Sequence, residues 1–515
     1  MDLAPSSTAS TRRVEFAPAF STLILTAPWL FAFTAGPLPT FWPWVASMVC
    51  AALLVAFGQL TPRAAAVGWL IAALCSCVIA MVQYFGLSSA LAPLIGQTEA
   101  GEAFGNLRQR NQFATLTSMG LVALIALRAA RPDAALPRWF FAAAVILLAA
   151  GNAASGSRTG LLQWVAIALL CTWWWRLERR DVLVLVVQAL LAYGVAILAL
   201  PWLLEVISGQ HSSGLFGRLV DDAGCSSRRV LYANVIELIA QKPWFGWGWG
   251  ELDYAHFIQP YRGPRFCEIL DNAHNLPLHL AVELGLPAAL AVCAGFAWAA
   301  LKAAPWHEED PYRRMAWGVI AVILVHSMLE YPLWYGPFQI AFVLCAWIVW
   351  RRRKAVGASV PEFGESRKSG ESRAKAKGAH WRLPLAAASV LALAYAGADY
   401  RRVSQLYLPL EQRSPAYRND TLDKVRDSVL FESQVEFAVF TTTAVRPDNA
   451  ASMHALGLRL LHFSPEPRVV EKIIQSAELL GRNKDASFFR ARYRAVFPRE
   501  FAAWASGPAA GKALP

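Results

Sequence analysis

The stretch DNAHNLPLHLAVELG, Asp271 to Gly285, places a histidine where a polar segment meets an apolar run. His274 precedes that run by two residues, and Asp271, Asn272 and Asn275 lie close enough in sequence to orient its imidazole ring and select its tautomer. A neutral imidazole near pH 7 is suited to take a proton from a hydroxyl group. His274 is therefore a candidate general base, although a single histidine at such a place is often only a helix cap or a membrane-interface residue.

Five arginines form a second set of candidates, because guanidinium groups bind phosphate oxygens in a bidentate manner and stay charged at any relevant pH. They are Arg108 and Arg110 in GNLRQRNQFAT, Arg158 in GSRTG, and Arg228 and Arg229 in CSSRRVLYANVIELIAQKPWFGWGWG. The last segment is predicted to be an amphipathic helix followed by a turn rich in glycine and tryptophan. Contact with lipid headgroups is the alternative explanation for the first three.

The stretch HSMLEYPLWY ends an apolar run with an acid, Glu330, followed by Tyr331. An acid at the end of a membrane helix needs a partner, and a nearby arginine would serve. The aromatic belt of a membrane protein would supply the tyrosine and tryptophan without any catalytic role. His279 and His326 lie deeper in apolar runs and are expected to be packing residues.

The elements that must hold these residues are membrane helices. Of the 515 residues, 56% are hydrophobic and 16% are charged, whereas a soluble protein carries charge on about a quarter of its residues. Many apolar runs are long enough to cross a hydrocarbon core of about 30 Å. The sequence predicts an all-α polytopic membrane protein with about 11 transmembrane helices (10–12), at 20–36, 40–58, 65–86, 112–128, 139–155, 160–175, 182–203, 276–300, 315–330, 336–350 and 383–399.

Basic residues orient these spans, because cytoplasmic loops carry an excess of lysine and arginine. Alternate connections hold Arg12, Arg13, Arg63, Arg128, Arg131, Arg138, Arg176, Arg179, Arg180, Lys302, Arg313, Arg314, Arg351, Arg352, Arg353 and Lys354. The opposite, exoplasmic side then receives the 87–111 connection, the turn at Arg158, the loop 204–275 and the turn 330–336. No cleavable signal is expected ahead of the first span.

Four parts of the chain are predicted: a transmembrane catalytic domain at 1–350, a basic cytoplasmic linker at 351–382, a last transmembrane helix at 383–399, and a periplasmic helical domain at 400–515. The last part has apolar periodicity near 3.6 residues, with too few repeats to assign a tetratricopeptide array. Cys225 and Cys267 share the exoplasmic loop, where an oxidising compartment would allow a disulfide. Two free thiols remain the alternative.

Several functional classes are disfavoured. The net charge of +12 suits a nucleic-acid partner, but the basic residues cluster beside the spans, where membrane orientation accounts for them. The sequence contains no CxxC, HExxH or GxxxxGK[ST] motif. No metal, nucleotide or other cofactor is therefore expected.

The motifs RQRNQFAT, GSRTG, SRRVLYANVIELIAQKPWFGWGWGE, DNAHNLPLHLAVELG and HSMLEYPLWY, in this order, resemble the O-antigen ligase and polymerase superfamily of bacterial envelope enzymes. The chain is most similar to the O-linked protein oligosaccharyltransferases of the PglL type, over nearly its whole length. This resemblance implies roles for His274, Arg158, Arg228 (or Arg229 in an alternative register), Tyr331 and the polar residues Arg108, Gln109, Arg110, Asn111 and Gln112. Tyr232 stands where a tryptophan is expected.

The resemblance implies transfer of a preassembled glycan from undecaprenyl pyrophosphate to Ser or Thr of a periplasmic protein such as pilin. The enzyme would lie in the bacterial inner membrane, with its active site facing the periplasm. Related ligases use the lipid A core as acceptor, and polymerases extend another lipid-linked glycan; the catalytic residues do not separate the three. The exoplasmic helical region at 400–515 favours a protein acceptor.

A lipid-linked glycan transporter is the non-enzyme alternative. It would need polar residues through the membrane interior. The middles of the predicted spans are instead almost purely apolar, and the polar residues gather at one face.

Overall fold

The computed structural model describes residues 8–58, 60–130, 137–175, 179–210, 214, 224–356 and 381–507, with side chains at 18–350 and 381–507 of these. Within these ranges the chain forms α- and 3-10 helices and no strand. Arg131, Arg176 and most of the predicted linker 351–382 lie outside the described residues. The side chains of Arg12, Arg13 and the basic run from Arg351 to Lys354 do so as well.

The chain folds into two compact units, each of which is discontinuous in sequence. Unit 1 comprises Met1–Asp221 and Trp298–Tyr395, and unit 2 comprises Asp222–Ala297 and Ala396–Pro515. These boundaries differ from the predicted domains, because residues 222–297 join the C-terminal helices in one unit. Helices α12 (Leu286–Ala303) and α16 (Arg382–Ser404) each pass from one unit to the other.

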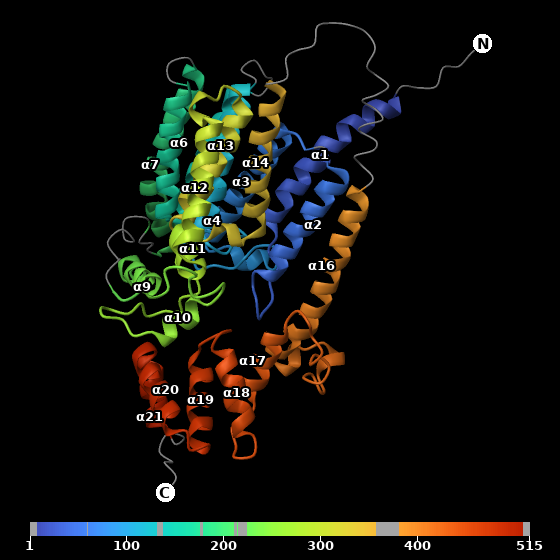
Figure 1. Ribbon diagram of the computed structural model, residues 1–515. Helices are drawn as coiled ribbons and strands as arrows, with labels where there is room; N and C mark the ends of the chain where they lie inside the picture. The colour runs from blue at the N-terminus through green and yellow to red at the C-terminus, as the bar shows by residue number, and fades with distance from the viewer. Residues whose placement is uncertain are drawn as a thin grey trace, which may run out of the picture. The chain divides into compact units, whose positions relative to one another are not determined.

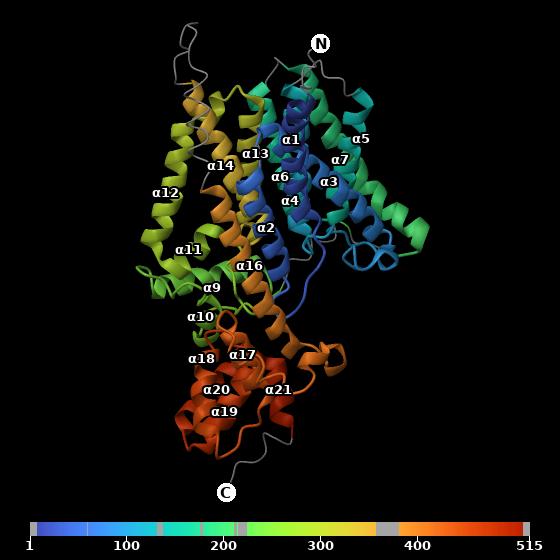
Figure 2. The ribbon, with the colours of Figure 1, turned by 90° about the vertical axis from the view of Figure 1, so that its right-hand side faces the viewer.

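Unit 1 contains the helices from α1 to α7 and from η2 to α14, and Figure 1 labels most of the α-helices among them. They are α1 (Thr8–Leu30), α2 (Phe41–Phe57), α3 (Pro62–Tyr84), η1 (Ser88–Leu91), α4 (Arg110–Ala130), α5 (Arg138–Ser155), α6 (Arg158–Trp175), α7 (Arg180–Ser208), η2 (Pro305–His307), α13 (Pro311–Ser327), η3 (Pro332–Trp334) and α14 (Gly336–Val356). Helix α4 packs against α3, α5, α6 and α13, and Figure 2 shows α4 among them. In the most apolar stretch of α4, 83% of the residues are buried, whereas in that of α7 only 28% are buried. The motif at the start of α4 is therefore carried by the central helix of this unit.

Among the residues that the structure describes, six helices are long and apolar enough to cross a membrane: Pro62–Tyr84, Arg110–Ala130, Arg138–Ser155, Arg180–Ser208, Leu286–His307 and Arg382–Tyr407. Pro18–Leu30, Phe41–Phe57 and Gly336–Trp350 are apolar but shorter. A helix occupies each of the eleven predicted spans, but the prediction of one continuous helix at 276–300 is wrong. The structure breaks that span at Gly285 into α11 (Leu276–Leu284) and α12.

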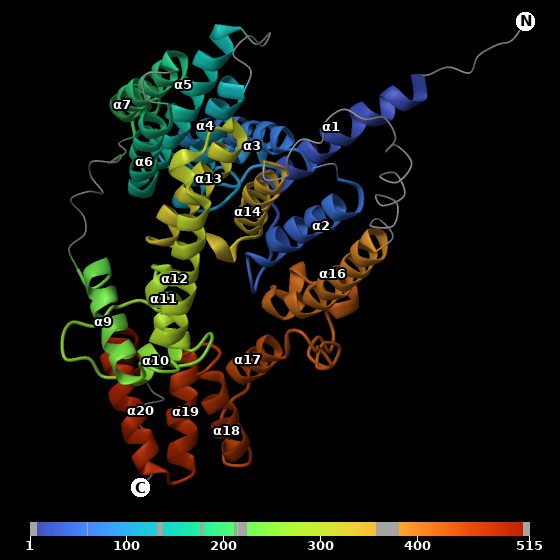
Figure 3. The ribbon, with the colours of Figure 1, turned by 45° about the horizontal axis from the view of Figure 1, so that its top comes forward.

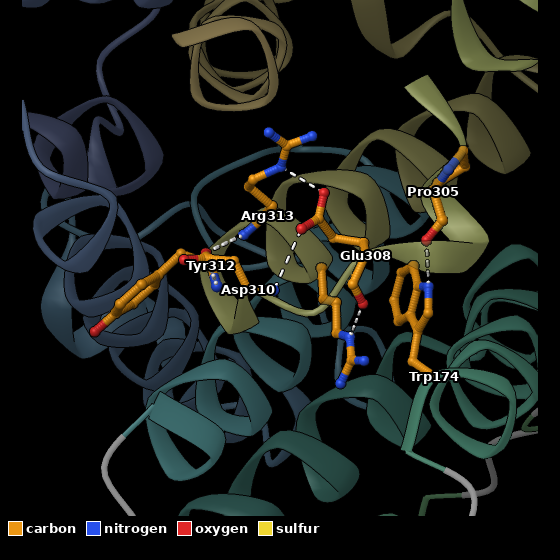
Figure 4. A network of polar contacts seen from close by, with 7 residues as sticks. Trp174, Pro305, Glu308, Asp310, Tyr312 and Arg313 are labelled. Atoms are coloured by element: carbon orange, nitrogen blue, oxygen red, sulfur yellow. Dashed lines mark hydrogen bonds and ion pairs between the residues drawn. The ribbon is translucent and has the colours of Figure 1, made fainter. Parts of the chain in front are cut away.

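A polar network fixes the connection between α12 and α13 (Figure 4). Asp310 caps α13 by accepting hydrogen bonds from the backbone N–H groups of Tyr312 and Arg313, both at 3.0 Å. Arg313 is buried and paired with Glu308, and Trp174 at the end of α6 donates its indole N–H to the Pro305 carbonyl at 2.8 Å. Arg313, which the sequence suggested only as an orientation signal, thus also stabilises this turn.

Unit 2 contains two hydrophobic cores. The first is formed by α9 (Arg228–Gln241), α11 and one side of α10 (Leu252–Ile258). The second is formed by the tail helices, which are α17 (Glu432–Thr442), α18 (Ala450–Leu460), α19 (Pro467–Leu479), α20 (Asn483–Val496) and α21 (Pro498–Ser506), preceded by η4 (Gln405–Tyr407), η5 (Leu410–Gln412) and η6 (Pro415–Tyr417). Figure 3 shows α18, α19 and α20 side by side, each packed on the next. The predicted helical region after residue 400 is thus confirmed as helical.

Candidate functional site

The predicted site residues fall into two local groups. Arg108 to Gln112, Arg158, Glu330 and Tyr331 lie in unit 1, whereas Arg228, Arg229, His274 and Asn275 lie in unit 2 with Cys225 and Cys267. Each group is built from segments that are distant in sequence. The two groups are described in turn.

In unit 1, Glu330 joins the RQRNQ motif to the turn that follows α13. Its carboxylate accepts hydrogen bonds from the side-chain amides of Gln109 at 3.3 Å and Asn111 at 3.4 Å. Asn111 in turn accepts a hydrogen bond of 2.6 Å from the Ser157 hydroxyl, and Ser157 accepts one from the backbone N–H of Gly160. Three of the sequence motifs therefore meet at one point. The sequence suggested an arginine as the partner of Glu330, and the structure shows the amides of Gln109 and Asn111 at its carboxylate. The sequence did not indicate a role for Ser157.

A buried polar layer lies directly beneath these motifs. Gln163 donates to the Thr115 hydroxyl at 2.8 Å and to the Val322 carbonyl at 2.9 Å, and it accepts a hydrogen bond of 3.0 Å from Ser118. His326, which is fully buried, lies with Nδ1 2.9 Å from the Thr115 hydroxyl. These residues are within about eight positions of the helix ends that carry the motifs, or about 12 Å along a helix. The prediction of almost purely apolar residues concerned the middles of the spans, whereas these polar residues lie closer to the helix ends that carry the motifs.

The arginines of unit 1 differ in their surroundings. Arg110 begins α4 and is paired with Glu102, so its charge is already compensated. Arg158 is the first residue of α6. Arg108 is exposed, adopts a left-handed backbone with φ of 60°, and has no ion pair or hydrogen bond within the described part of the chain. Arg108 is thus the arginine of this motif whose charge is available.

Arg108 lines a cavity of about 510 Å³ at the end of α1. Phe33, Pro93, Ile95 and Phe104 supply apolar side chains to the remaining wall, and Thr34 and Gln97 supply polar ones. A guanidinium group with apolar side chains nearby suits a ligand that joins an anionic head to a hydrocarbon chain. No signal in the sequence indicated that residues 32–34 and 92–97 would enclose the space next to Arg108.

The other predicted residues of unit 1 are less exposed. Gln112 is buried, and its amide nitrogen has no hydrogen-bond partner among the described residues. Tyr331 stacks on Tyr335, with ring centroids 6.1 Å apart, and contacts Trp334 at 5.3 Å. Tyr331 therefore belongs to an aromatic cluster at the turn that Glu330 opens.

In unit 2, His274 sits on a tightly held backbone. Its φ is 49°, in the left-handed region that few residues other than glycine adopt. Its N–H donates to the Asn272 side chain at 2.8 Å, and its carbonyl accepts from the Tyr232 hydroxyl at 3.4 Å. Asn275 caps α11 by accepting from the Leu278 N–H. Strained backbones of this kind persist where the surroundings determine them, as at functional sites.

Helix α9 brings Arg228 and Arg229 toward this segment. Ser227 caps the helix, and Arg228 and Tyr232 share one face because they are four residues apart. The Tyr232 hydroxyl contacts the His274 carbonyl, so the N-terminal half of α9 lies next to the His274 segment. Arg229 is exposed. The predicted amphipathic helix is confirmed as a helix, and the tyrosine at position 232 makes a hydrogen bond through its hydroxyl.

Cys225 and Cys267 form a disulfide, with Cα atoms 5.4 Å apart. The bond joins the residues just before α9 to the segment that leads to His274. It closes a loop of the chain with a sequence separation of 42. Of the two alternatives, bonded or free thiols, the structure has the bond.

Two titratable residues of α10 were not predicted. Burial lowers the pKa of His256 to about 3, and the Arg265 guanidinium adds to this effect. The neutral ring then donates through Nε2 to the Phe266 carbonyl at 3.1 Å and accepts from the Tyr261 hydroxyl at 2.7 Å. Burial also raises the pKa of Asp253 to about 7, reinforced by the carboxylates of Glu251 and Asp271. His256 is therefore a structural residue, and Asp253 adds an acid close to the His274 segment.

Family comparisons cover both units. Residues 103–127 match the protein glycosylation ligase family, residues 142–293 match the O-antigen ligase family, and residues 314–510 match the C-terminal region of the virulence factor membrane-bound polymerases. The resemblance to the O-antigen ligase and PglL-type superfamily is confirmed. The ligase match includes Arg158, Arg228 and His274, and the glycosylation-ligase match includes Arg108.

Two relatives of this superfamily are oligosaccharyltransferases from Acinetobacter baylyi. One is a ComP-specific O-oligosaccharyltransferase, 25% identical over 257 residues, which are 50% of this chain and 45% of the relative. The other is a general O-oligosaccharyltransferase, 24% identical over 281 residues, with 52% and 46% covered. The chain thus spans about half the length of the curated relatives it matches. Together with the apolar helices, these matches support a multi-pass membrane enzyme of the glycan-ligase kind.

Proposed function

We propose that this protein is an O-oligosaccharyltransferase that moves a preassembled glycan from undecaprenyl pyrophosphate to Ser or Thr side chains of a periplasmic protein such as pilin. In this proposal the chain crosses the bacterial inner membrane eleven times and its site faces the periplasm. Residues 1–350 carry the chemistry and 400–515 face the periplasm. The names of the two relatives and the match to glycosylation ligases support transfer to protein.

The observation that carries the proposal is Arg108 at its cavity. A lipid-linked pyrophosphate combines an anionic head with a hydrocarbon chain. The exposed guanidinium and the apolar side chains of Phe33, Pro93, Ile95 and Phe104 offer complementary groups for the two parts. Arg158, Arg228 and Arg229 are proposed to contact the same head. Arg110, which is compensated by Glu102, is proposed to hold the start of α4.

The proposed reaction is a single displacement. His274 takes the proton from the acceptor hydroxyl as its oxygen bonds to the anomeric carbon of the glycan. The bond from that carbon to the pyrophosphate oxygen breaks, and its electron pair leaves with the pyrophosphate. Fixed guanidinium charges stabilise the charge that develops on the leaving group. Gln109, Asn111, Gln112, Asn275, Glu330 and Tyr331 are proposed to support these groups.

A transfer assay tests the proposal. Purified protein is mixed with undecaprenyl-pyrophosphate-linked glycan and a candidate pilin, and the intact mass of the pilin is measured. We expect a glycan-sized gain in mass with inversion at the anomeric centre. Loss of a general base typically lowers the rate by 10²–10⁴-fold, so His274→Ala should give almost no product.

Two arginine variants add a matched comparison. A hydrogen bond to a charged group contributes about 1.5–3 kcal/mol, so Arg108→Gln should raise the KM for the donor by about 10- to 100-fold. Arg426→Gln removes an exposed tail arginine that is paired with Asp423 and should leave this KM unchanged. If both variants changed the donor KM equally, the cavity at Arg108 would no longer support the proposal.

Other products would assign other functions. Glycan on lipid A core, with none on protein, would indicate an O-antigen ligase. Glycan added to a second lipid-linked glycan would indicate a polymerase. A donor that binds and crosses the membrane without forming any covalent product would indicate a transporter, for which the buried polar layer around Gln163 and His326 would be the first candidate path.

A further inference from the structure

Helix α10 is shared by the two hydrophobic cores of unit 2. Leu252 and Ala255 are buried in the core of α9 and α11, whereas Phe257 is buried in the core of the tail helices, with Tyr254 and Ile258 packed beside it. Residues three and four positions apart lie on one face of a helix. The two sets therefore occupy different faces, and this seven-residue helix is held from both sides.

Polar and aromatic contacts add to this packing on the tail side. The Tyr254 ring stacks on the His462 ring, with centroids 3.8 Å apart and planes at 25°. Nδ1 of His462 lies 2.7 Å from a carboxylate oxygen of Glu251, and because a carboxylate only accepts, the imidazole N–H donates. His462 closely follows α18, so the end of a tail helix is bound to the start of α10.

The other face of α10 supports the His274 segment. Leu252 and Ala255 share their core with Leu270 and Ala273, which are almost completely buried. Ala273 is the neighbour of His274 in the chain. Close-packed cores transmit displacement rather than absorb it, so a shift of α10 changes the surface on which residues 270–274 rest.

The segment between α10 and residue 270 is also fixed by hydrogen bonds. Arg265 donates to the carbonyls of His256 and Gln259 at the end of α10. The Phe266 N–H donates to the Asn234 side chain of α9 at 2.8 Å, and Asn234 donates to the Pro264 carbonyl at 2.9 Å. Residues 264–266 are therefore tied to both α10 and α9, which couples α10 to the chain that leads to His274.

We propose that the tail helices position the His274 segment through α10, with Tyr254 and His462 as positioning residues for the transfer step. This inference rests on the proposed function, in which His274 is the general base. The tail then affects the chemical step itself, in addition to any binding of the acceptor. Deletion of residues 400–515 would uncover Phe257 and Tyr254, so a truncated chain cannot separate these two roles.

The test uses the full chain and four substitutions. Tyr254→Leu keeps apolar volume but removes the ring, Tyr254→Phe keeps the stacked ring, and His462→Gln keeps a polar partner for Glu251 without a ring. Arg459→Gln is the control, because Arg459 lies at the end of α18, three residues before His462, but its ion pair is with Glu436 of α17. For each protein, kcat, the KM of donor and acceptor, and amide hydrogen exchange at residues 266–275 are measured.

We expect Tyr254→Leu and His462→Gln to lower kcat by about 10-fold or more, since small misplacements of catalytic groups can cost up to about 10²-fold. The donor KM should stay unchanged, and exchange at residues 266–275 should become faster. Tyr254→Phe should retain kcat within about twofold, and the Arg459→Gln control should match the wild type. Rescue by phenylalanine identifies ring stacking as the cause.

Two results would overturn the inference. One is an unchanged kcat with a raised acceptor KM, which would limit the tail to acceptor binding. The other is unchanged exchange at residues 266–275 in both ring-deletion variants. If Tyr254→Leu also exposes α18–α20 to exchange, His462→Gln decides the outcome, because it leaves Tyr254 and Phe257 in place. If the wild type transfers no glycan, the proposed function fails, and the exchange data alone decide the coupling.

Discussion

Substitution of Gly285 tests how the break between α11 and α12 is built. Gly285 has φ of 90° and ψ of 162°, a region that is essentially restricted to glycine and costs other residues about 1–3 kcal/mol. A Cβ atom there would lie 2.2 Å from the Trp244 carbonyl oxygen and 2.5 Å from its carbon. Both are backbone atoms, so the loop that carries Trp244 would have to move away.

That movement would break three backbone hydrogen bonds. Trp247 and Gly248 donate to the carbonyls of Val282 and Glu283 at 2.8 and 3.0 Å, and Leu286 donates to Pro243 at 2.8 Å. Each contributes about 1 kcal/mol net. With the backbone strain, Gly285→Ala should cost about 4–6 kcal/mol if all three are lost.

Amide hydrogen exchange at Trp247 and Gly248 measures this cost locally, without requiring reversible unfolding of a membrane protein. A loss of about 4 kcal/mol corresponds to exchange roughly 10³-fold faster. Two other glycines of unit 2 separate the causes. Gly250→Ala introduces strain alone, because φ is 78° but a Cβ would meet open space, and Gly263→Ala introduces neither strain nor overlap.

The expected loss of local stability is largest for Gly285→Ala, about 1–2 kcal/mol for Gly250→Ala, and close to zero for Gly263→Ala. If Gly285→Ala exchanged no faster than Gly250→Ala, the close approach of the loop to the helix break would be refuted. If it matched Gly263→Ala, the positive φ would be refuted as well.

Three further predictions concern stability, each measured as the midpoint of thermal unfolding in detergent. Cys225→Ser should lower the free energy of unfolding by about 2–4 kcal/mol, and a reductant should destabilise the wild type but not the variant; equal sensitivity to reductant would contradict the bond to Cys267. Gln163→Leu should cost about 3 kcal/mol because it removes three buried hydrogen bonds of about 1 kcal/mol each, and an unchanged midpoint would contradict the buried layer. Asp253 has a pKa of about 7 in the folded protein, above the ordinary value of 3.8, so the stability from its neutral form is present below about pH 4 and is lost as pH rises through about 7. Asp253→Asn should therefore stabilise the protein at about pH 8, by up to about 3 kcal/mol after solvent screening, with little effect at about pH 4; a pH-independent effect would refute this.

The helical class and the positions of the apolar helices follow from the sequence, because apolar runs and caps act locally. The runs beginning near residues 65, 112 and 182 each became one continuous helix. The run at 276–300 did not, since no local rule showed that the turn around Trp244–Gly248 would pair with the backbone at Gly285. The sequence likewise singled out Glu330 and the RQRNQ motif. It could not show that Asn111 would contact both Glu330 and Ser157, because those contacts depend on how α4, α6 and α13 pack.

The sequence by itself determined the apolar helices and the residues that could bind phosphate or transfer a proton, among them Arg108 and His274. It could do so because residue type and spacing fix local structure and charge. Only the tertiary structure decided which of these residues are already satisfied: Arg110 has Glu102, whereas Arg108 faces a cavity. It also decided that the His274 loop and the tail form one unit. The physical reason is burial, since α10 can cover its two apolar faces only by packing against both segments at once.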